Sequence, residues 1–419
     1  MVGKTKTATR TIQFKETVDS TFDFKEADNG WGAHGIHPYP AMMIYPIARR
    51  LIHEYSEEGD RILDPFVGSG TVLLESVLHN RDSIGFDINP LALLIAKVKL
   101  TPLPAKKLYF LLTEILETHK RGSPKSVTFH NINFWFKPDV IEALSLLLSA
   151  IGEIEDEKYR NFFLIAFSET VRRASNTRNS EFKLYRRRPQ ELAEFRPDVA
   201  GIFKDVSSKN IFKLSQTYRT FPQYNGKAEI LEWDSRNRPD MIGEESVDLI
   251  LTSPPYGDSR TTVAYGQFSR LFLQWIGAGK RNIDKESLGG TPTKESAQNL
   301  ESEVFRDVIR KIADCDEKRA AEVRAFFEDF AKCFSNFVPL IKRGGYLCLV
   351  VGNRRVKRIT IPTDTIFAEM GLALGLKHIN TIIRNIPNKR MPRMNSPTNI
   401  RGETEVTINT ESIVMMRKG

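Results

Sequence analysis

A serine, two prolines and a tyrosine, Ser253-Pro254-Pro255-Tyr256, follow closely on a mainly apolar run, residues 247–251. An apolar run that stops at prolines is typical of a buried strand ending at the edge of a sheet. In an open α/β sheet, ligands bind outside the carboxyl ends of the strands. Proline has no N–H to donate, so the neighbouring carbonyls remain available as acceptors between a hydroxyl and an aromatic ring. The stretch is therefore suited to holding a planar group with an exocyclic amine.

A second stretch that could bind a ligand is the glycine-rich turn Asp64-Pro65-Phe66-Val67-Gly68-Ser69-Gly70-Thr71. It lies between a short apolar predicted strand and an apolar predicted helix. Glycines let the backbone approach a ligand, and the helix N-terminus offers free N–H groups. The next predicted strand, 83–86, ends in Asp87-Ile88-Asn89, and an acid about 20 residues beyond such a turn is placed to bind a ribose diol. Because the spacing differs from GxGxxG and Asp64 adjoins the turn, we predict a cationic ligand rather than a pyrophosphate.

Two basic segments are candidates for contact with a polyanion. Residues 172–188 hold seven basic residues and one acid, interleaved with serine, asparagine, Phe182 and Tyr185. This mixture suits phosphate, base-edge and stacking contacts, and the alternative is a solvated basic loop. Residues 385–401 hold several basic residues and no acid. The candidate residues for this contact are Arg172, Arg173, Arg178, Lys183, Arg186, Arg187, Arg188, Lys389, Arg390 and Arg393.

The composition restricts the class of protein. The 419 residues are 41% hydrophobic, which is ample for a core, and the net charge of +9 favours polyanionic partners. Three cysteines without a CxxC pair argue against a disulfide framework or a zinc site. Residues 1–15 are polar and unlike a secretory signal, and no apolar run approaches the roughly 18 residues that span a membrane. We therefore expect a cytoplasmic protein without a metal.

The periodicity predicts an α/β domain, residues 31–100 and 226–419, that follows an N-terminal arm, residues 1–30. A mainly helical insertion, residues 101–225, interrupts it. Within the insertion, apolar spacing predicts helices over 108–118, 140–154 and 161–171. The sheet resumes at 228–231 and 346–351, and a strand pair, 378–384 and 408–416, closes it. The aromatic run 134–136 is more typical of a core than of a base-stacking platform.

Three stretches resemble motifs of the DNA amino-methyltransferases, which methylate exocyclic amines of adenine or cytosine with S-adenosylmethionine. Residues 64–71 resemble the cofactor motif, Ser253-Pro254-Pro255-Tyr256 the catalytic motif, and His37-Pro38-Tyr39-Pro40 the helical cofactor motif. Together with further strand matches, the resemblance covers 30–100 and 226–417. It implies a Rossmann-like class I methyltransferase sheet and makes the insertion a candidate target-recognition region.

The resemblance also implies roles for individual residues. Asp87 would hold the cofactor's ribose hydroxyls, and Asp234, after the third strand, would lie beside its adenine. Ser253 and the Pro254 carbonyl would accept the amine hydrogens of a base flipped out of duplex DNA, and Tyr256 would stack on that base. The implied cofactor-binding residues are His37, Pro38, Asp64, Pro65, Phe66, Gly68, Ser69, Gly70, Thr71, Asp87, Asn89, Asp234 and Ser253, and the catalytic residues are Ser253, Pro254, Pro255 and Tyr256.

Serine at the first catalytic position usually accompanies cytosine N4 in this family, and aspartate or asparagine accompanies adenine N6. The resemblance thus favours N4-cytosine methylation of duplex DNA, within a restriction-modification system whose endonuclease is a separate chain. The sequence contains no Pro-Cys nucleophile, which argues against methylation at cytosine C5 through a covalent thiolate adduct. An N6-adenine enzyme, an RNA base methyltransferase and an inactive DNA-binding relative remain alternatives. In many family members with Ser-Pro-Pro the catalytic motif precedes the cofactor motif, whereas here it follows.

Overall fold

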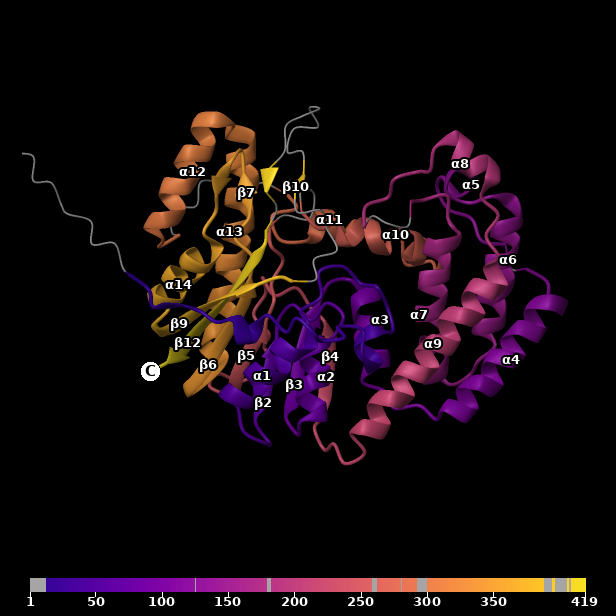
Figure 1. The fold of residues 1–419 in the computed structure, drawn as a ribbon, viewed down its shortest axis with the longest axis horizontal. Helices are drawn as coiled ribbons and strands as arrows, with labels where there is room; N and C mark the ends of the chain where they lie inside the picture. Colours follow the sequence, from indigo (N-terminus) through magenta and orange to yellow (C-terminus); the bar gives the residue numbers. More distant parts are fainter. Residues whose placement is uncertain are drawn as a thin grey trace, which may run out of the picture.

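The computed structural model describes residues 13–124, 126–178, 182–257, 262–279, 281–291, 300–387, 394–395, 405–406 and 408–419. An eight-stranded sheet in the order β1-β9-β12-β6-β5-β2-β3-β4 forms its centre (Figure 1). The parallel strands are β2 (Arg61–Asp64), β3 (Asp82–Asp87), β4 (Ala228–Glu232), β5 (Val247–Thr252) and β6 (Ile341–Val351). At the other side, β9 (Leu376–Asn385) and β12 (Thr410–Lys418) form the predicted antiparallel closing pair. This topology confirms the α/β, Rossmann-like prediction.

Helices cover both faces of the sheet, which is why its central strands are apolar on both sides. Leu249 and Leu251 pack in one buried cluster with residues of α1 (Tyr45–Tyr55). Ile250 points the other way, into a second cluster. That cluster is built by α12 (Glu303–Cys315), α13 (Glu317–Phe337) and α14 (Thr363–Ala373).

Residues 16–23 join the sheet, and in this the structure differs from the predicted N-terminal arm. Strand β1 (Glu16–Val18) pairs in parallel with β9. The ring of Phe22, in the short helix η1 (Ser20–Phe22), is completely buried, and the Asp23 carboxylate accepts a hydrogen bond of 2.7 Å from the Asn385 N–H. Burial of a phenylalanine and pairing with a longer strand together outweigh the polar composition of the segment.

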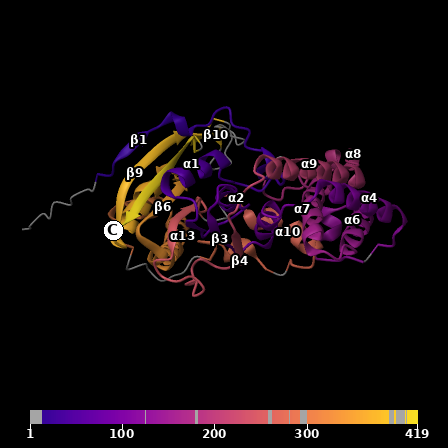
Figure 2. The ribbon, with the colours of Figure 1, turned by 90° about the horizontal axis from the view of Figure 1, so that it is seen from below.

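The insertion forms a helical lobe at one end of the molecule, with β9 at the opposite end (Figures 1 and 2). Helices α4, α6 and α7 confirm the three predicted helices. The lobe is continuous with the rest of the core, since its buried cluster includes Leu91 of α3 (Pro90–Lys99) and Phe268 of α10 (Tyr265–Trp275). Its helices are α4 (Ala105–Arg121), α5 (Ile132–Trp135), α6 (Pro138–Gly152), α7 (Glu157–Ala174), α8 (Pro189–Glu194) and α9 (Val199–Thr220).

A buried carboxylate, Glu75 of α2 (Thr71–Leu78), joins three segments behind the glycine turn. It accepts hydrogen bonds of 2.7 Å from His34 Nε2 and 2.8 Å from Arg49 Nε, and His79 Nε2 lies 3.4 Å away. His34 belongs to the short helix η2 (Gly32–Gly35), and Arg49 to α1. The carboxylate therefore fixes the helix that follows the turn to both neighbouring elements.

No described helix is long and apolar enough to cross a membrane. Among the described residues there is also no cluster of three or more histidine, cysteine, aspartate or glutamate side chains that would hold a metal ion.

Candidate active site

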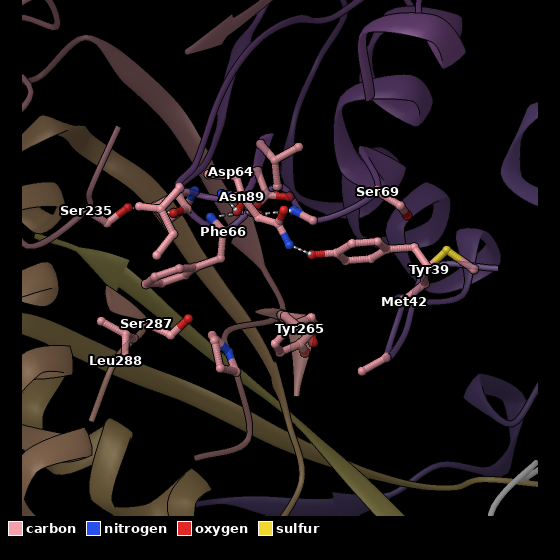
Figure 3. Close-up of a pocket in the computed structure, with 18 of the residues that line it drawn as sticks. Tyr39, Met42, Asp64, Phe66, Ser69, Asn89, Ser235, Tyr265, Ser287 and Leu288 are labelled. Carbon is pink, nitrogen blue, oxygen red and sulfur yellow. Dashed lines mark hydrogen bonds between the residues drawn. The ribbon is translucent and has the colours of Figure 1, made fainter. Parts of the chain in front are cut away.

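A pocket lies at the carboxyl ends of β2, β3 and β5, and its empty volume is about 900 Å³ including open solvent (Figure 3). This is where an open α/β sheet is expected to bind its ligand. The glycine turn and the catalytic stretch both contribute to its wall. Of the residues predicted from the sequence, those that line it are Asp64, Pro65, Phe66, Gly68, Ser69, Thr71, Asp87, Asn89, Asp234, Ser253 and Pro255.

Five predicted residues are described but do not line the pocket: His37, Pro38, Gly70, Pro254 and Tyr256. His37 is buried with its Nε2 3.3 Å from Ser168 Oγ, and Pro38 is exposed; the pocket wall begins one residue later, at Tyr39. Neither residue lines the pocket, because the loop turns the residues that follow them inward.

Gly70 has a packing role. Its φ of +80° lies in the left-handed region, and a Cβ built there would stand 2.7 Å from the Ala96 Cβ of α3. Glycine is needed at this position so that α3 can pack directly on the turn.

Asp87, at the end of β3, faces the pocket with a carboxylate that is already oriented. Its Oδ2 accepts a hydrogen bond of 2.9 Å from the Gly68 N–H, and its Oδ1 accepts one of 2.8 Å from the Asn89 N–H. Burial raises the pKa of Asp87 to about 6. Because a carboxylate has about four acceptor positions, Asp87 can still receive hydroxyl groups from a ligand.

Asp64, at the end of β2, connects the two motifs. Its Oδ1 accepts hydrogen bonds of 3.0 Å from the Phe66 N–H and 2.6 Å from Thr252 Oγ1. Burial raises the pKa of Asp64 to about 7. Since Thr252 directly precedes Ser253, this carboxylate fixes the glycine turn and the catalytic stretch relative to each other.

Aromatic residues outside the predicted set complete the pocket. Tyr39 and Tyr265 stack with ring centroids 5.9 Å apart, and the Tyr39 hydroxyl accepts a hydrogen bond of 3.1 Å from Asn89 Nδ2. In Figure 3, Tyr39 and Ser69 lie on one side and Phe66 and Leu288 on the other. Tyr39 lies between two prolines of a recognised motif, so it could have been predicted from the sequence. Tyr265, at the start of α10, belongs to no recognised motif and could not.

Asp234 lies at the pocket, but its carboxylate already has a strong partner. Arg236 donates to it from Nη2 at 2.6 Å and from Nε at 3.0 Å, and its Nη1 also donates to Asp329 at 3.2 Å. A contact between Asp234 and an adenine would therefore be made by a carboxylate whose charge is balanced by an arginine.

The catalytic stretch leaves β5 as predicted, with the strand ending at Thr252. Ser253 and Pro255 face the pocket, and Pro254 is buried. The Tyr256 hydroxyl donates a hydrogen bond of 2.9 Å to Glu411 Oε1. An acceptor group and an aromatic ring are thus held close to the pocket by a stiff backbone.

The described parts of the basic segment, residues 172–178 and 182–188, form part of the folded insertion. Arg172 and Arg173 belong to the last turn of α7, and an isolated β-bridge joins Thr177 to Arg186. Three guanidinium groups of this segment cover aromatic rings: Arg172 lies 4.6 Å from the centroid of Phe268, Arg186 lies 4.3 Å from that of Phe134, and Arg187 lies 4.2 Å from that of Phe195.

The remaining candidates of this segment, Arg178, Lys183 and Arg188, are half-buried or exposed. Lys389, Arg390 and Arg393 lie outside the described residues.

The prediction that the aromatic run 134–136 belongs to the core is correct for Phe136, which is buried, but not for Phe134, which is 43% exposed.

Comparisons with known proteins identify the family of this chain. Residues 5–98 match a family model described as DNA methylase. The chain is 38% identical over 411 residues to Type II methyltransferase M.MvaI of Kocuria varians, covering 92% of this chain and 90% of the relative. It is 37% identical over 113 residues to Type II methyltransferase M.MjaII of Methanocaldococcus jannaschii, covering 27% of this chain and 21% of that one.

Among solved structures, a SAM-dependent methyltransferase of Methanosarcina mazei aligns with 90% of this chain and 99% of its own at 11% identity, with a TM-score of 0.32. The long sequence match to the Kocuria varians relative shows the family. The chain belongs to the DNA amino-methyltransferase family, whose cofactor is S-adenosylmethionine.

Proposed function

We propose that this chain methylates the N4 amine of cytosine at a specific site in duplex DNA. The main observation in support of this proposal is that Ser253 lines the same pocket as Asp64 and Asp87. The pocket therefore combines a hydroxyl that can accept a hydrogen bond from an amine with two acids that suit a cationic cofactor.

The pocket residues fit S-adenosylmethionine. Asp87, anchored by two backbone N–H groups, would hold the ribose hydroxyls. The apolar side chains of Phe66, Trp233 and Leu288 would enclose the adenine, and Ser69 and Tyr39 would lie toward the methionine part. When bound, the cofactor supplies an electrophilic sulfonium methyl group.

An exocyclic amine of a base is a weak nucleophile, since its lone pair is delocalised into the ring. Acceptors fixed against the amine hydrogens draw electron density back to nitrogen, and we assign this role to Ser253 and the Pro254 carbonyl. Fixed dipoles aimed at developing charge need no reorganisation during the reaction. The base must first be flipped out of the duplex, because the amine cannot be reached inside it.

Three observations support the remaining parts of the proposal. The long match is to a protein named as a Type II methyltransferase, which favours a DNA substrate and a restriction-modification system with its endonuclease on another chain. Serine in place of aspartate or asparagine favours cytosine N4. The insertion, in which residues 172–178 and 182–188 carry basic side chains and Thr177 bridges to Arg186, is our candidate for target recognition.

The product decides the target. Duplex DNA incubated with the protein and S-adenosylmethionine, then digested and analysed by mass spectrometry, is expected to contain N4-methylcytosine. N6-methyladenine as the sole product would overturn the choice of base, and transfer to RNA alone would overturn the substrate. Sequencing of the methylated positions would identify the recognition site.

Cofactor affinity is expected to fall as the pH drops below about 6, the raised pKa of Asp87. Ribose hydroxyls donate to the ionised carboxylate, so protonation of Asp87 removes an acceptor that the ligand needs. Asp87→Ala should weaken binding by about 1–3 kcal/mol at neutral pH and reduce the pH dependence. Calorimetry from pH 5 to 8 measures both. Asp82→Ala, at the exposed start of the same strand, is the matched control, and an Asp87→Ala variant with normal affinity would exclude the assignment.

Neutralising Arg186 and Arg188 to glutamine is expected to weaken DNA binding and to flatten its salt dependence, by about 0.9 log units in slope for each phosphate that the protein no longer neutralises. Both side chains are exposed, whereas Arg187, over Phe195, is half-buried. Fluorescence anisotropy across a salt series measures the slope. Lys120→Gln with Arg121→Gln, two exposed residues at the end of α4, tests the effect of net charge alone. An unchanged slope for the first pair would identify a solvated loop.

A further inference from the structure

A lysine side chain is completely buried directly behind the wall of the pocket. Lys99 is the last residue of α3, and its Nζ donates a hydrogen bond of 3.2 Å to Ser69 Oγ in the glycine turn. Ser69 lines the pocket, on the side that holds Tyr39 in Figure 3. The amine of Lys99 is therefore separated from the ligand space by a single hydroxyl group.

A buried ammonium group is costly unless an opposite charge balances it. Within the described part of the chain, no carboxylate lies at ion-pair distance from Lys99 Nζ. Burial lowers the pKa of Lys99 to about 7, and the like charge of Lys213 adds to this effect. Lys213 is itself held in place, since its Nζ donates to the Gly35 carbonyl at 2.8 Å. An anion in the pocket would balance the positive charge that the fold keeps on this side.

The hydrogen bond between Lys99 and Ser69 leaves the serine able to donate. A charged ammonium group only donates, so Ser69 Oγ accepts from it and keeps its own proton for another acceptor. Ser69 also lies two residues before the start of α2 at Thr71, where the first N–H groups of a helix have no partner within the helix and favour an anion. Both features suit a carboxylate at Ser69.

We propose that Lys99 is a positioning residue for the carboxylate of the cofactor's methionine part, and that it acts through Ser69. The Ser69 hydroxyl would accept from the ammonium group and donate to the carboxylate, so that the two opposite charges lie on either side of one hydroxyl in a site of low dielectric. This inference rests on the proposed function, which places the methionine part toward Ser69. It goes beyond that function by giving a role to a residue that does not line the pocket.

The test compares two ligands that differ in the amino-acid part. S-adenosylhomocysteine has the carboxylate, whereas 5′-methylthioadenosine has the adenosine and the sulfur but no amino acid. Lys99→Met is expected to weaken the binding of S-adenosylhomocysteine about tenfold or more, the scale of one hydrogen bond to a charged group, and to change the affinity for methylthioadenosine by less than about twofold. Calorimetry at neutral pH measures both affinities. A lysine with only a structural role would affect both ligands alike.

Ser69→Ala should show the same dependence on the ligand. Because both residues act through one contact, the double variant should lose little more affinity than the weaker-binding single variant. Lys97→Met, at an exposed position of the same helix, is the matched control and should bind both ligands normally.

Equal weakening of both ligands by Lys99→Met, or an unchanged affinity for S-adenosylhomocysteine, would overturn the inference. If Lys99→Met does not fold, a normal affinity of Ser69→Ala for S-adenosylhomocysteine would still overturn it. A wild-type chain that binds both ligands but methylates no DNA would instead refute the proposed function.

Discussion

Replacing Ser253 with alanine is expected to lower the turnover number about 100-fold or more, the scale for losing one preorganised electrostatic contact in an active site. The hydroxyl accepts from the amine most strongly as the methyl group moves, so its removal acts on the transition state. Cofactor affinity should change little, since Asp87 and the glycine turn remain. Rapid-quench kinetics and calorimetry on the same protein separate the two effects.

Ser246→Ala provides the matched control for this prediction. Ser246 immediately precedes β5, and its hydroxyl donates to the Gly243 carbonyl at 2.6 Å, away from the pocket. That variant should retain full turnover. A Ser253→Ala enzyme with near-normal turnover, or one whose loss comes entirely from a weaker affinity for S-adenosylmethionine, would show that Ser253 is not an acceptor for the reacting amine.

Replacing Glu75 with leucine is expected to lower the free energy of unfolding by about 3–5 kcal/mol, because one member of a buried charge network is removed and its partners stay behind. Burial acts to raise the pKa of Glu75, but the hydrogen bonds from His34 and Arg49 and the nearby His79 ring hold it well below its usual value of 4.5. Chemical denaturation measures the loss of stability. Because Glu75 lies behind the cofactor pocket, the variant should also bind S-adenosylmethionine more weakly.

The pH dependence gives this second prediction a sign. A carboxylate with a lowered folded-state pKa contributes stability that is complete above its unfolded-state pKa, 4.5, and is lost as the pH falls. The difference between wild type and Glu75→Leu should therefore be constant near neutral pH and shrink below about pH 4.5. Glu117→Leu, at an exposed ion pair with Lys120, should have little effect. Equal losses for both variants would contradict a special role for the buried network.

The sequence predicted those parts of the site that local pattern encodes. The strand end before Ser253 and the turn from Asp64 to Thr71 are each written in consecutive residues, where prolines and glycines restrict the backbone. The distinction between Pro38 and Tyr39 was missed because motif resemblance identifies a segment and does not show which side chains it turns inward.

Other parts depend on contacts that sequence periodicity cannot show. Glu411 lies 155 positions from Tyr256 and belongs to a strand that was predicted only as a closing element. Its hydrogen bond to the catalytic stretch follows from the order of strands in the sheet. Arg236 likewise changes the chemistry of Asp234 through a contact that is close in sequence but depends on how the backbone turns after β4.

The place of the insertion in the sheet has a consequence for the route by which this chain folds. Strand β3 ends at Asp87 and its neighbour β4 begins only at Ala228, yet the two pair residue by residue. The helices between them make most of their contacts with one another, so the lobe can form before the two strands pair, whereas closing the long loop before it forms would cost more entropy. We expect the helical lobe to condense first and to bring β4 to β3. Trp233 and Asp234, which follow β4, would then be among the last groups to reach the pocket, so competence to bind the cofactor would mark a late step of folding.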